Sequence, residues 1–243
     1  MLSTNFSWRL PLVLLGAGSG RRLGAASAGR PKLLLSLSEG TQSSGRTVLD
    51  ELLDTWKPWT SEVFVVAALQ APPLLDGLKH HAIPSTVVVQ PEPDGTLNAL
   101  MLLADSLREH FIVVLGDCLV AGHLSGPSRP FRGVGVWDDS DEGTVSRNYS
   151  VRLDGDLVRE VEEKPRAPSG ALCGMGLYFL DREFLDASRD APKDQHGRRE
   201  MTDALQFFIS RGGQLQVARL RGEYVNINTP VELDRARRLF GPR

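Results

Sequence analysis

"LPLVLLGAGSGRRLGAASAGRPKLLLSL", residues 10–37, begins as an apolar run and continues into a glycine-rich stretch with arginines and a Pro-Lys pair. The apolar run is typical of a parallel strand that is buried on both faces. Glycines directly after such a strand let backbone N–H groups approach an anion closely. The stretch therefore predicts a buried strand that leads into a turn suited to phosphate.

The rest of the first half alternates between short β-rich runs and helical patterns. Further strands are expected at residues 62–68, 85–90 and 111–115, and helices at 47–56, 72–81 and 96–110. This alternation is typical of an α/β sheet with crossover helices. Ligands on such sheets lie at the carboxyl ends of the strands, which is where the glycine-rich stretch falls.

After Asp117 the pattern becomes mixed. We expect strands at 131–139, 171–181 and 214–220, a hairpin over 150–165, and helices at 182–188, at 200–211 and from Thr229-Pro230 onward. A Thr at the N-cap followed by Pro at the first helical position favours that last start. Nothing resembles a linker, so the sequence predicts one α/β domain over residues 1–243 with a mixed, mostly parallel sheet flanked by helices.

The composition excludes several classes of protein. A chain of 243 residues with a formal net charge of -2 has no basic excess with which to coat nucleic acid. The apolar run near the N-terminus is too short to span a bilayer, so no membrane is expected. Cys118 and Cys173 match no metal or CxxC spacing, which predicts reduced cysteines and a cytoplasmic setting.

The glycine-rich stretch matches neither of two common phosphate-binding motifs. Gly16, Gly18 and Gly20 are spaced GxGxG and not GxGxxG, and no Gly-Lys-Ser/Thr ending is present. What remains is a turn of exposed amides with Arg22 and Lys32 beside it, which could clamp a triphosphate. The residues of this stretch alone leave open that these cations are solvated loop charges.

Seven motifs, in order, resemble those of the sugar-phosphate nucleotidyltransferases. "LLGAGSGRRLG…RPKLLLSL" is similar to their L-A-A-G-x-G-x-R-L…P-K-x-L signature, and the six that follow are "QPEPDGTLNAL", "VVLGDCL", "VEEKP", "GMGLYFLD", "EMTDAL" and "YVNINTP". The resemblance spans about residues 10–239. It implies a Rossmann-like (GT-A-like) fold, with a nucleotide-binding part at about 10–117 and an acceptor-binding part at about 118–243.

The resemblance also implies the reaction. It predicts a magnesium-dependent enzyme that transfers a nucleoside monophosphate from a triphosphate, with a pyrimidine favoured, to a sugar 1-phosphate, releasing pyrophosphate. Such catalysis is mostly positioning and charge neutralisation. Because the similarity stops near the end of the chain, it implies a short form without the C-terminal left-handed β-helix of bifunctional members. A homo-oligomer remains possible.

The resemblance assigns roles residue by residue. Arg22 and Lys32 are the expected catalytic cations, with Arg22 on the terminal phosphates and Lys32 on the α-phosphate. Asp117 and Asn226 are the expected magnesium ligands. The expected nucleotide-binding residues are Leu15, Gly16, Ala17, Gly18, Gly20, Gln90, Gly95 and Thr96, and the expected acceptor-binding residues are Glu163, Lys164 and Gly176.

Three departures from the family pattern keep alternatives open. Asn226 stands where most members carry aspartate, and Gly174 stands where they carry an asparagine beside the acceptor. Residues 38–47 form a longer loop than usual, interpreted as a tolerated surface insertion. The alternatives are a cytidylyltransferase for a non-sugar phosphate (phosphocholine, a polyol or inositol phosphate, a phosphonate) and a catalytically silent nucleotide-binding homologue. A more distant resemblance, to the molybdopterin guanylyltransferases, is disfavoured by the long gap between Arg22 and Lys32.

Overall fold

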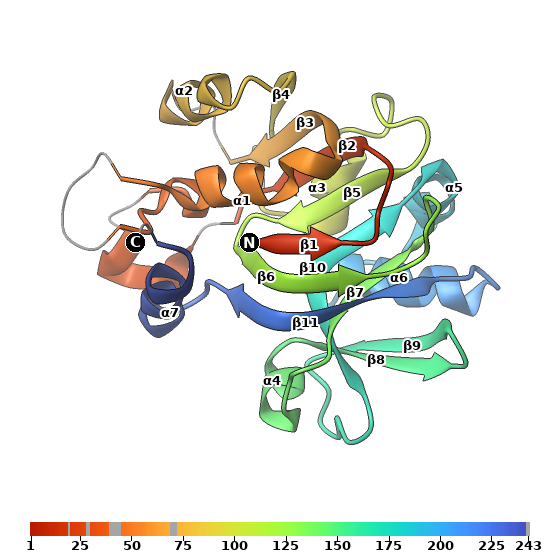
Figure 1. The fold of residues 1–243 in the computed structure, drawn as a ribbon. Helices are drawn as coiled ribbons and strands as arrows, with labels where there is room; N and C mark the ends of the chain where they lie inside the picture. The colour runs from red at the N-terminus through yellow and green to blue at the C-terminus, as the bar shows by residue number, and fades with distance from the viewer. Residues whose placement is uncertain (19, 28–29, 39–44, 69–71, 242–243) are drawn as a thin grey trace.

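The computed structural model describes residues 1–18, 20–27, 30–38, 45–68 and 72–241 (Figure 1). The strands are β1 Leu2–Thr4, β2 Leu10–Leu15, β3 Thr60–Ala67, β4 Ser85–Val89, β5 Phe111–Leu115, β6 Cys118–Ser125, β7 Gly133–Trp137, β8 Tyr149–Asp154, β9 Leu157–Glu163, β10 Leu172–Leu180 and β11 Gln216–Asn226. The α-helices are α1 Val48–Trp56, α2 Pro72–His80, α3 Thr96–Met101, α4 Glu142–Arg147, α5 Arg182–Ala187, α6 Met201–Ser210 and α7 Pro230–Phe240. Short 3-10 segments cover Arg21–Ser27, Lys32–Leu34, Lys57–Trp59 and Ser188–Asp190.

The strands of the described residues form one mixed sheet in the order β1-β6-β11-β7-β10-β5-β2-β3-β4, with the β8–β9 hairpin attached to β10. Strands β4, β3, β2 and β5 are parallel, β10 is antiparallel to β5 and β7, and β11 is parallel to β7 but antiparallel to β6. The directions of β2, β5 and β11 therefore coincide. Their carboxyl ends meet at one edge of the sheet, which is where the predicted site residues lie.

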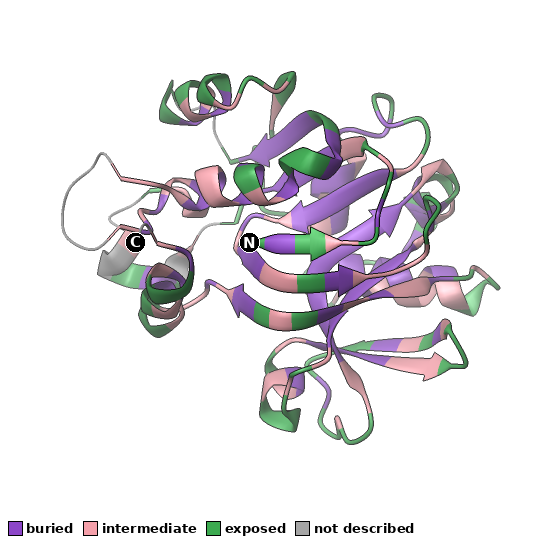
Figure 2. Cartoon of the chain, viewed as in Figure 1, coloured by how far each residue is buried: buried purple, intermediate pink, exposed green. Residues whose placement is uncertain are grey.

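Two apolar cores cover the two faces of the sheet. Along β2, Leu12 and Leu14 pack into a core with residues of α1, α2 and α7, whereas Val13 and Leu15 pack into the opposite core with residues of α3, α5 and α6. This alternation follows from the period of two along a strand. Figure 2 shows the central strands almost entirely buried, with exposed residues on the outer helices and at the hairpin. The predicted α/β class, a mixed sheet flanked by helices, is confirmed.

The expected strands at the centre of the sheet are confirmed, with β2 and β5 at the predicted bounds. The helix predicted over 96–110 is wrong in its length, because α3 ends at Met101. Beyond it the N–H groups of Leu103 and Ala104 bond three residues back, at 3.0 and 3.1 Å, and Arg182 donates to the Ala104 carbonyl at 2.8 Å. Tertiary contacts thus replace the last helical turns while the apolar residues stay buried.

The C-terminal elements follow their local signals with one extension. α7 begins as predicted, with Thr229 and Glu232 forming a capping box and Pro230 in the first turn. The strand expected at 214–220 is instead β11, which runs six residues further, to Asn226.

Both cysteines are free and buried. Within the ranges given above, none of the helices combines the length and apolarity that a bilayer crossing requires. The residues 39–44 of the predicted surface loop lie outside the described part of the chain.

Candidate active site

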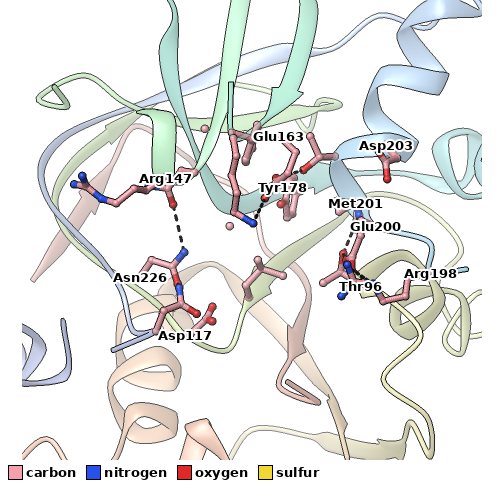
Figure 3. Close-up of a pocket in the computed structure, with 18 of the residues that line it drawn as sticks. Thr96, Asp117, Arg147, Glu163, Tyr178, Arg198, Glu200, Met201, Asp203 and Asn226 are labelled. Atoms are coloured by element: carbon pink, nitrogen blue, oxygen red, sulfur yellow. Dashed lines mark hydrogen bonds and ion pairs between the residues drawn. The ribbon is translucent and has the colours of Figure 1, made fainter. Parts of the chain in front are cut away.

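A cavity of about 440 Å³ opens at the carboxyl edge of the sheet. It is bounded by residues from the ends of β5, β9 and β11, from β10, and from the starts of α3 and α6. Figure 3 shows Asp117 and Asn226 on one side and Thr96, Glu200 and Asp203 on the other, with Glu163 and Tyr178 between them. Of the predicted residues, the lining includes Arg22, Thr96, Asp117, Glu163, Lys164, Gly176 and Asn226.

Lys32 and Asp117 form the central ion pair of the site. Lys32 follows Pro31 at the start of a 3-10 turn, and Asp117 comes directly after β5 and Gly116. The Lys32 Nζ lies 2.6 Å from Asp117 Oδ2, and the two side chains are only 12% and 19% exposed. Low exposure limits screening by water and therefore strengthens the electrostatic interaction.

Asn228 joins the two predicted catalytic cations, a contact that the sequence did not reveal. Its Oδ1 accepts hydrogen bonds from Arg22 Nη2 and from Lys32 Nζ, both at 2.9 Å. Its Nδ2 donates to Asn226 Oδ1 at 2.7 Å. The only signal in the sequence was that Asn228 lies two positions after Asn226, a spacing that repeats one face of an extended chain.

Backbone bonds hold the end of β11 beside Asp117. The Ile227 N–H donates to the Asp117 carbonyl at 2.8 Å, and the Asn228 N–H donates to Glu232 Oε2 at 2.7 Å. Glu232 is already fixed by the capping box of α7. Asn226 and Asp117 are thus adjacent because β11 and the β5–β6 connection are locked together.

Lys164 and Glu163 line the cavity at the end of β9. Lys164 Nζ lies 3.3 Å from Glu163 Oε1, and Thr202 donates to Glu163 at 3.1 Å. The backbone of Lys164 is left-handed, with φ of 46°, and its N–H donates to the Asn148 carbonyl at 2.8 Å. A non-glycine residue in this region stores strain that the surroundings must overcome, and such strain concentrates at functional sites.

Close packing of neighbouring side chains explains why residues 174 and 176 of β10 are glycines. A Cβ at Gly174 would overlap the Tyr149 ring, and a Cβ at Gly176 would overlap Cys118 Sγ and the Leu115 side chain. Tyr149 itself is buried and donates to the Met175 carbonyl at 2.9 Å. The space that an asparagine side chain at position 174 would need is therefore filled by the Tyr149 ring.

Of Gln90, Gly95 and Thr96, the residues expected to bind the base, only Thr96 lines the cavity. The Thr96 N–H and Oγ1 donate to Glu200 Oε2 at 3.1 and 2.9 Å. Gly95 has φ of 117° and packs against the Arg199 backbone. Gln90 is 6% exposed, and its amide nitrogen donates to Asp94 Oδ1 at 2.6 Å and to the Gly95 carbonyl at 3.2 Å. Gln90 therefore lies behind this loop and supports it.

The signature glycines also lie outside the cavity lining. Gly16 is buried, and its N–H donates to the Val66 carbonyl at 2.7 Å, so it continues β2 against β3. Gly18 is exposed, and Gly20 has φ of 58°, a turn conformation that suits glycine. Leu15 and Ala17 are buried on the same segment. The turn delivers Arg22 to the cavity, while Ser19 is outside the described residues.

Burial shapes the titration of two groups near the site. The pKa of Asp203 is raised by burial and by the neighbouring carboxylates of Glu200, Asp194 and Glu163. The pKa of the Cys118 thiol is raised well above its usual range by burial, and Asp117 adds to the effect. The Cys118 thiol is thus a neutral core group, whereas the Asp203 carboxyl holds its proton more tightly because of burial and of the three other carboxylates that lie near it.

Comparison with known proteins finds similarity to nucleotidyltransferases along nearly the whole chain. Residues 12–123 match the family model described as MobA-like NTP transferase domain, and residues 133–224 match the one described as Nucleotidyl transferase. The UTP--glucose-1-phosphate uridylyltransferase AglF of Haloferax volcanii is 25% identical over 92% of this chain and 93% of that protein. The Bifunctional protein GlmU of Methanocaldococcus jannaschii is 23% identical over 91% of this chain, which spans only 52% of that relative.

Solved structures share the fold. A UDP-glucose pyrophosphorylase complexed with UDP-glucose superposes with a TM-score of 0.78 at 18% identity, over 96% of this chain and 98% of the other. An inositol-1-phosphate CTP transferase from T. maritima gives 0.76 at 14% identity, over 97% and 98%. At these identities the likeness concerns the fold. The sequence is nevertheless similar to nucleotidyltransferases along nearly its whole length, with two nucleotidyltransferase family models matching consecutive parts of it.

Proposed function

We propose that this protein transfers a nucleoside monophosphate from a nucleoside triphosphate to a sugar 1-phosphate, producing an NDP-sugar and pyrophosphate. The observation that carries the proposal is the arrangement of charge across the cavity. Arg22 and Lys164 both line the cavity, from the signature turn and from the end of β9, and Asn228 joins Arg22 to Lys32, which is not itself a lining residue. Cations from separate segments suit two phosphorylated substrates whose phosphates must meet.

The chemistry requires positioning and no covalent enzyme intermediate. An oxygen of the acceptor phosphate attacks the α-phosphorus, the bond between that phosphorus and the α–β bridging oxygen breaks, and its electron pair leaves with pyrophosphate. Lys164 would hold the attacking phosphate, and Lys32 would offset the charge that develops on the α-phosphate. Bringing two anions together in this orientation and neutralising the new charge are the main sources of rate in such reactions.

Asp117 and Asn226 fit a magnesium ion. Their side chains offer a carboxylate and an amide oxygen from adjacent segments, and Mg²⁺ prefers oxygen ligands and often takes only one or two carboxylates together with substrate phosphates. Among the described residues no group of three or more His, Cys, Asp or Glu side chains is arranged to hold a metal ion. Bound here, Mg²⁺ would neutralise phosphate charge. In this structure Asp117 Oδ2 pairs with Lys32 Nζ and Asn226 Oδ1 accepts from Asn228 Nδ2, so these two donors would have to share or release the ligand oxygens, and Lys32 would then be free to reach the α-phosphate.

The polar end of the cavity suits a hydroxylated acceptor. Glu163, Glu200 and Asp203 supply carboxylate oxygens that accept from hydroxyl groups. For the base we propose Thr96, which lines the cavity, and the neighbouring Gly95 backbone, with Gln90 holding their loop. A pyrimidine NTP remains our proposal.

A cytidylyltransferase acting on a non-sugar phosphate is the second candidate. It is favoured by Gly174, where the Tyr149 ring replaces the amide that the family resemblance would place beside a sugar. The similarity in fold to an inositol-1-phosphate CTP transferase is consistent with it.

The test is pyrophosphate release with Mg²⁺ and each of four NTPs against sugar 1-phosphates, inositol 1-phosphate and phosphocholine. We expect one sugar 1-phosphate to give the highest kcat/KM and the Lys164→Ala variant to raise KM for that acceptor. The variant Lys193→Ala, an exposed lysine outside the cavity lining, is the matched control. Release with inositol 1-phosphate or phosphocholine alone would select the second candidate. Nucleotide binding without any release would indicate a silent homologue and refute both enzymatic proposals.

A further inference from the structure

A second cavity of about 330 Å³, here called the outer pocket, adjoins the active-site cavity. Seven residues line both cavities: Arg22, Arg147, Asn148, Lys164, Tyr224, Asn226 and Asn228. The outer pocket continues beyond these residues toward Arg235 on α7. The shared residues thus form a neck between two compartments, and the predicted magnesium ligand Asn226 lies in that neck.

The outer pocket is strongly basic. It is lined by Arg22, Arg147, Lys164 and Arg235, and Glu232 is its only carboxylate among the described residues. Glu232 is turned to the backbone, because its Oε2 accepts from the N–H groups of Asn228 and Thr229 at 2.7 and 2.8 Å. A concave surface lined by one sign of charge concentrates ions of the opposite sign.

Two of these cations form no ion pair within 4.0 Å in the described part of the chain. The carboxylate on which Arg147 acts is Asp141, whose pKa is lowered by hydrogen bonds from Thr144 and also by the charge of Arg147. Arg22 bonds only to the neutral amide of Asn228, and Arg147 donates to Thr144 Oγ1 at 3.3 Å. Figure 3 shows the Arg147 side chain extending away from Glu163 and the acidic end of the active-site cavity. Arg235 pairs with Glu223 at 2.8 Å and lies 5.9 Å from the centre of the Trp137 ring. Guanidinium groups without a carboxylate partner are suited to bind phosphate in a bidentate manner.

We infer that the outer pocket is a polyphosphate subsite, in which Arg147 and Arg235 face Arg22 and hold the terminal phosphates. This inference rests on the proposed function. In that reaction the attacking oxygen and the leaving oxygen lie on opposite sides of the α-phosphorus. With the acceptor in the inner cavity and the α-phosphate in the neck, the pyrophosphate that departs enters the outer pocket, where α4 and α7 supply its counter-charges.

The test is a calorimetric titration of the purified protein with pyrophosphate, with and without Mg²⁺, repeated for Arg147→Ala, Arg235→Ala and the double variant. Both side chains are substantially solvent-accessible, so the substitutions should leave the fold intact. Loss of one charge-assisted phosphate contact is expected to weaken pyrophosphate binding roughly 10- to 100-fold. Arg159→Ala, an exposed arginine of β9 outside both linings, is the control and should bind as the wild type does.

The outcomes separate this inference from the proposed function. Absence of pyrophosphate binding in the wild-type protein, or equal binding in all variants, overturns the subsite. A second titration uses glucose 1-phosphate: if Arg147→Ala weakens that ligand and leaves pyrophosphate unaffected, the outer pocket belongs to the acceptor and the inference is wrong. Failure of the proposed function is seen elsewhere, as the absence of pyrophosphate release with every NTP and acceptor, and it leaves the binding measurement valid.

Discussion

Replacing Asn228 by alanine should slow nucleotidyl transfer without greatly changing the affinity for the triphosphate. Asn228 Oδ1 holds Lys32 Nζ and Arg22 Nη2 at 2.9 Å each, while Asp117 attracts the same lysine at 2.6 Å. Without the amide, the lysine is drawn to Asp117 alone. Its charge is then withdrawn from the α-phosphate at the moment when charge develops there.

The size of the effect follows from the contacts that are lost. A hydrogen bond to a charged group contributes about 1.5–3 kcal/mol. Because Lys32 is 12% exposed we assign about 2 kcal/mol to its bond, and because the Arg22 bond is exposed we assign at most about 1 kcal/mol to it. At 1.36 kcal/mol per factor of ten, the sum of about 2–3 kcal/mol corresponds to a roughly 30- to 150-fold lower kcat.

The assay is steady-state pyrophosphate release with the best NTP and acceptor pair, analysed for kcat and for KM of the NTP. Asn5→Ala is the matched control, since Asn5 also uses both ends of its amide, with Gly126, at 2.8 and 3.1 Å, but lies far from the site in the N-terminal segment. Its melting temperature should fall while kcat stays unchanged. If Asn228→Ala keeps kcat within about twofold of the wild type, the positioning argument is refuted.

Three further perturbations test other parts of the site. Lys32→Ala and Asp117→Ala should each lower kcat by roughly a hundredfold or more, measured in the same assay, because each removes charge from the centre of the reaction; near-normal turnover in either variant would show that its role is misassigned. Gly95→Ala should lower the melting temperature, since φ of 117° strains any L side chain and the new Cβ would overlap the Arg199 backbone; an unchanged temperature in a thermal melt would contradict this. The native pKa of Asp203 is raised, so the native state binds its proton more tightly than the unfolded chain does, and its carboxylate destabilises the fold at neutral pH. Asp203→Asn should therefore raise the free energy of unfolding at pH 7, and denaturant titrations should show this gain shrinking as the pH falls through the raised pKa; a gain that is independent of pH would argue against the carboxylate as its source.

The parts of the fold that the sequence predicted best are those with the strongest local pattern. Strands β2 and β5 are apolar runs that each follow a basic residue or histidine and end before a glycine, so their composition marks both ends. Strand β6 was not predicted, since it owes its existence to pairing with β1 and β11, two segments distant in the sequence. The true end of α3 depends on Arg182, which binds the Ala104 carbonyl from 78 positions away. No periodicity near residue 104 contains that information.

In the site, too, some residues could be predicted from local motifs, whereas others depend on contacts between distant segments. The motif resemblance pointed to Asp117, Lys164 and Asn226, and the structure places all three around one cavity. It gave Asn228 no role, although the residue lies within the YVNINTP motif, because a single amide after a strand has no distinctive pattern. Gln90 is polar at the end of a strand, which favoured a ligand contact, yet its amide is used within its own loop. Which polar side chains face a ligand is decided by neighbours that only the folded chain brings together.

Because β11 lies between β6 and β7, the candidate active site can be completed only after the ribosome has synthesised β11. Asn228 follows Arg22 by 206 positions and Lys32 by 196, so the ribosome makes the cations long before the residue that joins them. The strands of the first half can pair as they emerge, leaving Asp117 with Lys32 as its partner. Until β11 is inserted, β6 and β7 each have an open edge of the kind that promotes aggregation. Translation that stops before β11 would therefore yield an inactive chain that is prone to aggregate.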